Sequence, residues 1–405
     1  MKIIFNKRKF DNNFQIVERK GTGHPDTLAD NLAELLSAKY SNYTKENYGA
    51  VLHHNFDKLS LLGGASHVFF GGGYITQPIR VLLNGRVSDK FGDDVIPVYE
   101  LLENWIRDFL SEKLSLDRLK DIVIHNNIST QSSPGKTAEK SEEEGTRHYW
   151  FQPRDLDDLQ ELKKLVSNDT SLGVGFAPTS NLEKFTIDLE YDLSMGEFKL
   201  DNPWIGSDIK LMAIKNDNEY SLTVCIPQIA KYVPDVENYK KNIEKVHKYI
   251  QEYALRYGIN TIEIQSNTRD NFKTNELYLT VTGSSIESGD EGVVGRGNRI
   301  NQIITPTRPM SMEGASGKNP VYHIGKIYYI AAYQLASMIH EKFNIQNEVY
   351  LVSQSGRLLV DPWVAIVSVP EDFSKSEALK DFINKEITFI PNITDELLRM
   401  DYLIS

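Results

Sequence analysis

The sequence is poor in cysteine and in uninterrupted apolar runs, and each shortage excludes a class of protein. Cys225 is the only cysteine, so the chain can form neither an internal disulfide nor a cluster of thiolate metal ligands. The most apolar helix-like run, Ile327 to Ile339, contains Tyr, Gln and Ser and is too short to span a bilayer. No signal peptide is expected from MKIIFNKRKFDNN, because charges resume after a short apolar run. We therefore expect a cytoplasmic protein with no membrane contact.

Basic residues are fewer than acidic ones, 45 against 56. The formal net charge is −11, the pI is about 5.4, and no basic face stands out, which argues against nucleic acid as the main partner. The chain has 405 residues, of which 40% are hydrophobic and 25% charged. This composition is that of a globular protein, and the length predicts about two to three domains.

One stretch, residues 288–328, departs from the acidic background. It reads SGDEGVVGRGNRINQIITPTRPMSMEGASGKNPVYHIGKIY and carries seven glycines, with five basic residues against three acidic ones. Glycines allow backbone N–H groups to approach phosphate oxygens, while arginine and lysine supply positive charge, so the glycine-rich stretch predicts a site for a small polyanion. The acid pair Asp290 and Glu291 could hold Mg²⁺ on the phosphates. From composition alone, a solvated surface loop is an equally good interpretation.

Generic signatures of nucleotide binding and of nucleophilic catalysis are absent. MEGASGKN has neither the spacing of a Walker A loop nor its Ser or Thr after the lysine, and GRGNRI does not match the dinucleotide pattern of a Rossmann fold. No Ser/His/Asp or Cys/His arrangement is visible. His53 and His54 are adjacent, so on a strand they face opposite sides and cannot easily share one ion.

A second candidate site precedes a predicted helix over 25–41. Pro25 suits a first helical position, and Leu28, Leu32 and Leu35 recur at helical spacing. His24 and Asp26 would then lie at the helix N-terminus, where free N–H groups and the helix dipole attract anions. Capping of the helix by these two residues is an equally weighted alternative.

The remaining pattern predicts an α+β protein with helices against one face of its sheets. Further helices are expected at 97–114, 154–166, 181–193, 236–256 and 326–343, with a terminal helical region. Strands are expected at 14–20, 208–214, 219–226, 260–265, 275–283, 347–354 and 363–369, and within 49–87 and 121–126. Residues 129–150 are polar and charged and cannot bury a core, which predicts a mobile loop, either a lid or an inert extension.

The glycine-rich stretch resembles the phosphate-binding segment of archaeal-type methionine adenosyltransferases, also called S-adenosylmethionine synthetases. Five other segments resemble the family in the same order: ERKGTGHPDTLADNLAE (18–34), LHHNFDKLSLLGG (52–64), NDTSLGVGFAP (168–178), SDIKLMAI (207–214) and YLTVTGSS (278–285). The resemblance therefore spans most of the chain. The departure is at 129–136, where STQSS lacks the glycines of the family's ATP-binding segment.

This resemblance implies roles for individual residues. Phosphate-contacting catalytic residues would be His24, Lys210, Arg296 and Lys318. Other ATP or phosphate contacts would be Gly23, Asp169, Thr170, Ser171, Asp208, Gly289, Arg299, Ser316 and Gly317. Methionine would contact Asn55 and Asp57, and Mg²⁺ would be held by Asp26 and Asp290. A role for K⁺ is implied as well, without identified ligands.

The resemblance also implies architecture and activity. It implies three domains with approximate internal threefold symmetry and interleaved segments, approximated here by 1–130 with the GTGHPD loop, 131–285 with the charged loop, and 286–405 with the glycine-rich stretch. The implied reaction joins ATP and L-methionine in a homodimer with active sites at the interface. Two alternatives stay open: an ATP polyphosphate hydrolase or phosphotransferase, and a non-catalytic nucleotide-binding relative.

Overall fold

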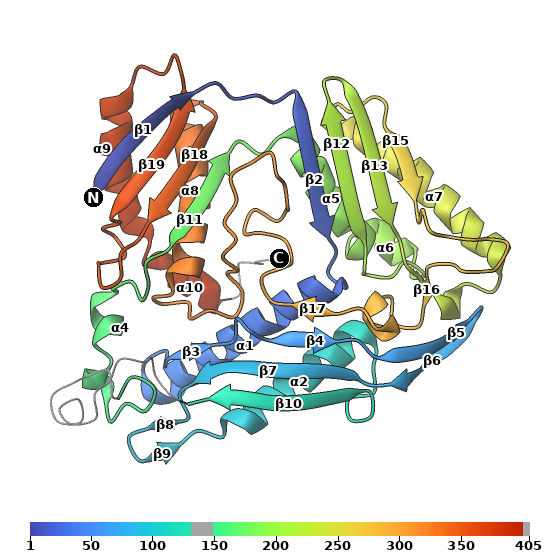
Figure 1. Ribbon diagram of the computed structural model, residues 1–405, viewed down its shortest axis with the longest axis horizontal. Coiled ribbons are helices and arrows are strands. Elements are labelled where there is room, and N and C mark those ends of the chain that lie inside the picture. Colours follow the sequence, from blue (N-terminus) through green and yellow to red (C-terminus); the bar gives the residue numbers. More distant parts are fainter. Residues whose placement is uncertain (131–148, 400–405) are drawn as a thin grey trace.

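The computed structural model describes residues 1–130 and 149–399, and it has the mixed helix and sheet of the predicted α+β class. Three larger sheets lie around the segment that joins β17 (Gly292–Val293) to α8 (Ile324–Phe343), drawn in orange in Figure 1. That segment is the central part of the glycine-rich stretch. Each sheet therefore borders the region where the sequence places its polyanion site.

The three sheets share one pattern of strand pairing. Sheet I contains β10 (Ile122–Ser129), β7 (Ile79–Val87), β4 (Ser60–Leu62) and β17, with β3 (His54–Asn55) also paired to β7. Sheet II contains β15 (Glu263–Ser266), β13 (Glu219–Cys225), β12 (Lys210–Asn216) and β2 (Phe14–Lys20). Sheet III contains β1 (Lys2–Arg8), β19 (Val364–Pro370), β18 (Asn347–Val352) and β11 (Leu172–Ala177). In each order the first pair is parallel and the next two are antiparallel.

Two helices pack on one face of each sheet, as the sequence predicts (Figure 1). Sheet I is covered by α1 (Pro25–Tyr48) and α2 (Val98–Leu114), sheet II by α5 (Asn181–Ser194) and α7 (Val236–Ala254), and sheet III by α8 and α9 (Ser376–Glu386). The apolar face of each helix and the inner face of its sheet form a separate hydrophobic core, because each must be removed from water. The threefold repetition of this unit agrees with the expected internal symmetry.

The repeating units exchange their first strands. β2 directly precedes α1 but joins sheet II, β11 precedes α5 but joins sheet III, and β17 precedes α8 but joins sheet I. At the N-terminus, β1 pairs with β19 and so completes sheet III. Each sheet thus takes strands from at least two of the ranges 1–130, 131–285 and 286–405, and the division of the chain into domains stays a prediction.

Five of the predicted helices correspond to α1, α2, α5, α7 and α8, while the prediction for 154–166 is wrong as one helix. There the chain forms a 3₁₀ turn (Leu156–Asp158) and a short α4 (Gln160–Lys164). The backbone leaves helical geometry at Leu159, and the Asp158 carboxylate binds the backbone N–H and guanidinium of Arg154. These local bonds compete with continuous helix formation.

The strand predicted at 275–283 shortens to β16 (Leu279–Thr280), which pairs with β14 (Gln228–Ile229). The buried Glu287 carboxylate accepts the N–H groups of Val281 and Thr282, which removes them from a sheet ladder. Of the charged segment predicted to be mobile, 129–150, residues 131–148 lie outside the described residues. In the part of the chain that the structure covers, no helix is long and apolar enough to cross a membrane.

The other elements are short. They are the hairpins of β5 (Ala65–Phe69) with β6 (Gly72–Gln77) and β8 (Lys90–Phe91) with β9 (Asp94–Val95), the helices α6 (Glu197–Asp201) and α10 (Asn392–Leu398), and several 3₁₀ turns.

Candidate functional site

The N-terminus of α1 is held close to sheet II by glycine. Gly23 donates its N–H to Ser207 O at 2.9 Å and accepts the Ser284 hydroxyl at 2.6 Å. A Cβ on Gly23 would lie 2.2 Å from the Ser207 hydroxyl oxygen, so no larger residue fits without movement. Gly23 therefore brings the start of α1 against the segment that contains Asp208 and leads into β12 at Lys210.

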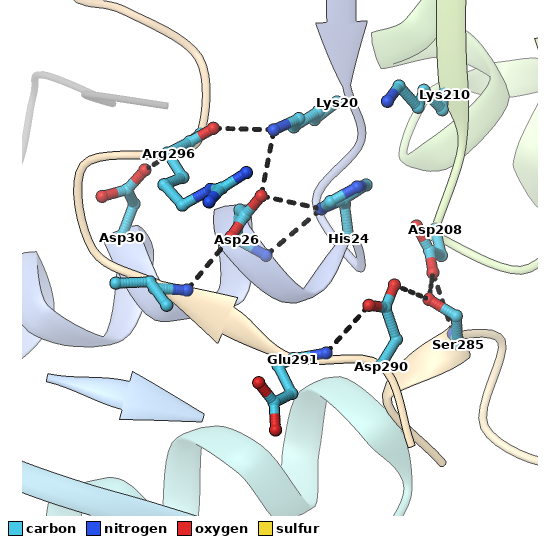
Figure 2. A network of polar contacts seen from close by, with 12 residues as sticks. Lys20, His24, Asp26, Asp30, Asp208, Lys210, Ser285, Asp290, Glu291 and Arg296 are labelled. Atoms are coloured by element: carbon cyan, nitrogen blue, oxygen red, sulfur yellow. Dashed lines mark hydrogen bonds and ion pairs between the residues drawn. The ribbon is translucent and has the colours of Figure 1, made fainter. Parts of the chain in front are cut away.

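His24 and Asp26 form the first turn of α1. The His24 Nδ1 accepts the Asp26 N–H at 3.2 Å, which makes His24 the N-cap that the alternative interpretation describes. Burial lowers the pKa of His24, although the nearby Asp208 opposes this effect. The buried Asp26 accepts the Val293 N–H at 3.0 Å and lies 2.9 Å from the ammonium of Lys20 (Figure 2).

Asp208 and Asp290 meet at one hydroxyl. Ser285 Oγ lies 2.5 Å from Asp208 Oδ2 and 3.1 Å from Asp290 Oδ2 (Figure 2). Asp208 also accepts the Tyr278 hydroxyl at 3.0 Å, and burial raises its pKa. Asp290, by contrast, is exposed. The structure thus joins two predicted site residues to Tyr278 and Ser285, which sequence reasoning did not single out.

Two predicted cations border this first group of residues. Arg296 is exposed, and its carbonyl accepts the Lys20 ammonium at 2.7 Å. Lys210 begins β12, is 40% exposed, and lies 3.2 Å from Glu18 on the neighbouring β2. In Figure 2 the side chains of Arg296 and Lys210 lie on either side of Lys20 and His24. Positive charge is therefore available around the N-terminus of α1, where the helix dipole also favours anions.

A second group of predicted residues lies further along α1. The Lys318 ammonium is 2% exposed, forms an ion pair with Glu313 and lies 4.0 Å from Asp57 Oδ2. Burial lowers the pKa of Lys318 to about 8, opposed by the charge of Asp57. Asn55 pairs with Lys318 as a β-bridge, and the Phe56 N–H donates to Gly317 O at 2.8 Å. The predicted methionine-binding residues and a predicted phosphate-binding lysine are therefore neighbours.

The predicted turn 169–171 borders this second group. Asp169 is close enough for its charge to raise the pKa of Lys318, in opposition to burial. Asp169 also accepts the Thr170 N–H at 2.7 Å, and Ser171 donates its N–H to the Ser353 hydroxyl at 2.9 Å. The turn is thereby held on the end of β18, with Asp169 and Thr170 exposed.

Within the glycine-rich stretch, several groups expected to face phosphate are engaged by the protein. The Arg299 guanidinium donates to Gly295 O and Gly297 O, so it braces the loop backbone. Gly317 donates its N–H to the Glu34 carboxylate at 3.0 Å. Gly289 ends a 3₁₀ turn with φ +86°, and Ser316 is buried. Phosphate contacts of these residues stay predictions.

Sequence reasoning missed three charged residues that bind members of the two groups or their flanking backbone: Lys20, Asp30 and Glu34. Asp30 is buried and accepts the N–H groups of Gly295 at 2.7 Å and Gly297 at 2.9 Å; burial raises its pKa to about 6. Glu34 forms an ion pair with the fully buried Lys326 at 2.6 Å. A signal was present, because Asp26, Asp30 and Glu34 recur every four residues and must share one helix face.

Comparison with known proteins gives consistent matches over the length of the chain. A family model described as S-adenosylmethionine synthetase (AdoMet synthetase) matches residues 3–145 and 152–401. A probable S-adenosylmethionine synthase of Aquifex aeolicus is 36% identical over 98% of this chain and 96% of its own length. An S-adenosylmethionine synthase of Thermoplasma acidophilum is 38% identical over 95% of this chain and 93% of its own.

A solved structure supports the fold independently of close sequence similarity. The chain resembles an unusual S-adenosylmethionine synthetase from Campylobacter jejuni with a TM-score of 0.60 and 14% identity, over 95% of this chain and 88% of the other.

Proposed function

The chain belongs to the S-adenosylmethionine synthetase family, and from that premise we propose that it forms S-adenosylmethionine from ATP and L-methionine. The methionine sulfur attacks C5′ of ATP, the S–C5′ bond forms, and the C5′–O bond breaks with its electron pair leaving on the triphosphate. Water then cleaves the triphosphate to pyrophosphate and phosphate. The observation that carries the proposal is the alignment of both residue groups along α1, joined by one glycine-rich stretch.

The chemistry explains why the site is rich in cations. A thioether sulfur has no proton to lose, so the first step needs no general base. It needs the sulfur held in line with C5′ and the growing charge on the triphosphate stabilised. We assign Arg296, Lys210, His24 and Lys318 to the phosphates. Asn55 and Asp57, next to Lys318, would position methionine, with the carboxylate facing its ammonium group.

We also assign Asp26 and Asp290 to Mg²⁺. Magnesium takes one or two protein carboxylates and fills its other positions with phosphate oxygens and water, so these residues fit in type and number. The described residues contain no group of three or more His, Cys, Asp or Glu suited to a metal, which agrees with a site completed by the nucleotide. When bound, the ion neutralises charge on the leaving polyphosphate. K⁺ is retained as a second cofactor without assigned ligands.

The function is tested by incubating the protein with ATP and Mg²⁺, with and without methionine. We expect a sulfonium product together with pyrophosphate and phosphate, only when methionine is present. Phosphate release that ignores methionine, without sulfonium, would favour a polyphosphate hydrolase or phosphotransferase. ATP binding without either product would favour a non-catalytic relative.

We propose a homodimer with active sites at the interface, because one face of sheet I is not covered by helices. Helices α1 and α2 cover one face, while alternate residues of β10 and β7 on the other face are exposed, including Val123, His125, Asn127 and Arg80. The adjoining β17 carries the exposed Val293, three residues from Asp290. Light scattering should give about twice the chain mass of 46.1 kDa; a monomer at micromolar concentration would contradict the proposal.

His24→Asn separates helix capping from phosphate contact. Asparagine is a good N-cap, so the thermal midpoint should stay close to that of the parent protein. Loss of the imidazole should lower kcat at least about 10-fold, the lower range for a hydrogen bond to a charged group. Ser180→Asn, at the N-cap of α5, is the matched control and should leave both quantities unchanged. A normal kcat in His24→Asn would leave His24 with capping alone.

A further inference from the structure

A stripe of three carboxylates on α1 holds the glycine-rich stretch by its backbone. Asp26, Asp30 and Glu34 are spaced by four residues, which places them in a row of roughly 12 Å along the helix. Together they accept four backbone N–H groups, from Val293 (3.0 Å), Gly295 (2.7 Å), Gly297 (2.9 Å) and Gly317 (3.0 Å). Carboxylate acceptors make such bonds stronger than neutral ones.

The bonds to Asp30 lie on either side of Arg296. Gly295 has φ +90°, a conformation that favours glycine, and a Cβ on Gly297 would lie 2.3 Å from the Asp30 carboxylate. The segment can therefore approach Asp30 only with glycine at 297. Between the two anchored N–H groups, Arg296 stays exposed, and Figure 2 shows its side chain beside Asp26. Asp30 itself is buried and would not touch a ligand that Arg296 reaches.

Glu34 anchors the backbone next to Lys318, as Asp30 does next to Arg296. It accepts the Gly317 N–H, one residue before Lys318, and its position is fixed by the buried ammonium of Lys326 at 2.6 and 2.7 Å. The carbonyl of Lys318 accepts the hydroxyl of Ser37, also on α1, at 3.0 Å. The backbone of Lys318 is thus tied to the same helix on both sides.

We propose that Asp30 and Glu34 are positioning residues for the reaction, which set the distance between Arg296 and Lys318 so that both reach one triphosphate. The inference rests on the proposed function, because it assigns these two cations to the nucleotide. Each cation directly follows a glycine whose N–H is bound to one of these carboxylates. Because the two carboxylates are four residues apart on α1, the helix fixes the distance between the two anchored glycines. Neither carboxylate takes part in bond making or breaking.

The test uses Asp30→Asn and Glu34→Gln, which keep side-chain size and remove the charge. We expect KM for ATP and the Kd of a non-hydrolysable ATP analogue to rise about 10-fold, with KM for methionine within about twofold. Hydrogen exchange of the Gly295 and Gly297 amides should accelerate in Asp30→Asn. Glu348→Gln is the matched control, since Glu348 is also a buried acid, on β18, bonded to Arg8 and Tyr350.

Double variants distinguish positioning from a general loss of structure. If Asp30 acts through Arg296, Asp30→Asn should have almost no further effect on the analogue Kd in an Arg296→Met background, and Glu34→Gln likewise in Lys318→Met. Full additivity, or unchanged analogue affinity despite faster amide exchange, would overturn the inference. If Asp30→Asn does not fold, the Glu34 arm gives the same answer. Analogue binding is read without turnover, so absence of sulfonium product in the parent protein would refute the function separately.

Discussion

Lys318→Met is expected to lower kcat/KM for ATP at least about 100-fold, a loss of about 2.7 kcal/mol of transition-state stabilisation, by analogy with the removal of one oxyanion donor. The substitution keeps the aliphatic stem but removes a buried ammonium placed between Glu313 and Asp57. Charge near a developing anion is worth most where water is excluded, and Lys318 is 2% exposed. In the structure its ammonium is paired with Glu313, so we expect phosphate to replace this carboxylate.

The pH dependence of kcat/KM in the unsubstituted protein tests the role of the Lys318 charge independently. Burial lowers the pKa of Lys318 to about 8, so its charged fraction falls as the pH rises through this value. We expect kcat/KM for ATP to fall above pH 8 in the parent protein and to lose that dependence in Lys318→Met. Lys199→Met is the control, because burial also lowers the pKa of Lys199 to about 8, in helix α6 of another unit. Equal losses in both variants would indicate a structural cause.

Asp290→Asn is the second large effect that we expect, again at least about 100-fold in kcat/KM. The exposed Asp290 carboxylate accepts the Glu291 N–H at 2.9 Å and lies 3.1 Å from the Ser285 hydroxyl, and within residues 1–130 and 149–399 it forms no ion pair. Asparagine can keep these hydrogen bonds, and the thermal midpoint should not change. The loss should therefore concern the metal, with a rise in the Mg²⁺ concentration needed for half-maximal rate.

Asp117→Asn provides the control for Asp290, since Asp117 is also an exposed carboxylate that accepts nearby backbone N–H groups, on the loop after α2. It should leave rate and metal dependence unchanged. A parent-like rate and parent-like Mg²⁺ dependence in Asp290→Asn would remove this residue from the mechanism.

The sequence predicted the parts of the fold that depend on local pattern. α1, α7 and α8 have apolar residues at helical spacing, and β12 with β13 forms a hairpin of neighbouring strands, so their burial follows from their own residues. The resemblance implies interleaved segments, but the exchange of β2, β11 and β17 between sheets could not be predicted from local pattern, because the sequence of a strand does not specify its partner strand. The break at Leu159 escaped for a related reason, since Asp158 competes with the helix by bonding Arg154.

In the candidate site, too, some residues could be predicted from the sequence and others could not. The resemblance predicted His24, Asp26, Lys210, Asp290 and Arg296 as site residues, and in the structure these residues lie around the N-terminus of α1. The bonds of Asp30 and Glu34 escaped because their partners lie 265 to 283 residues away in the sequence. An acidic residue on a helix with a polar face is normally interpreted as solvated. Only the three-dimensional arrangement shows that these carboxylates face backbone amides.

The exchange of β2, β11 and β17 among the three sheets has a consequence for how the protein unfolds. Removing any one repeat would remove the edge strand from the sheet of a neighbouring repeat. The removed repeat would in turn lack the edge strand of its own sheet. Unpaired backbone N–H and C=O groups would then be exposed in both sheets. Unfolding of a single third of the protein by itself is therefore disfavoured. The candidate site lies where these exchanged strands meet α1 and the glycine-rich stretch, so its geometry depends on all three sheets being folded.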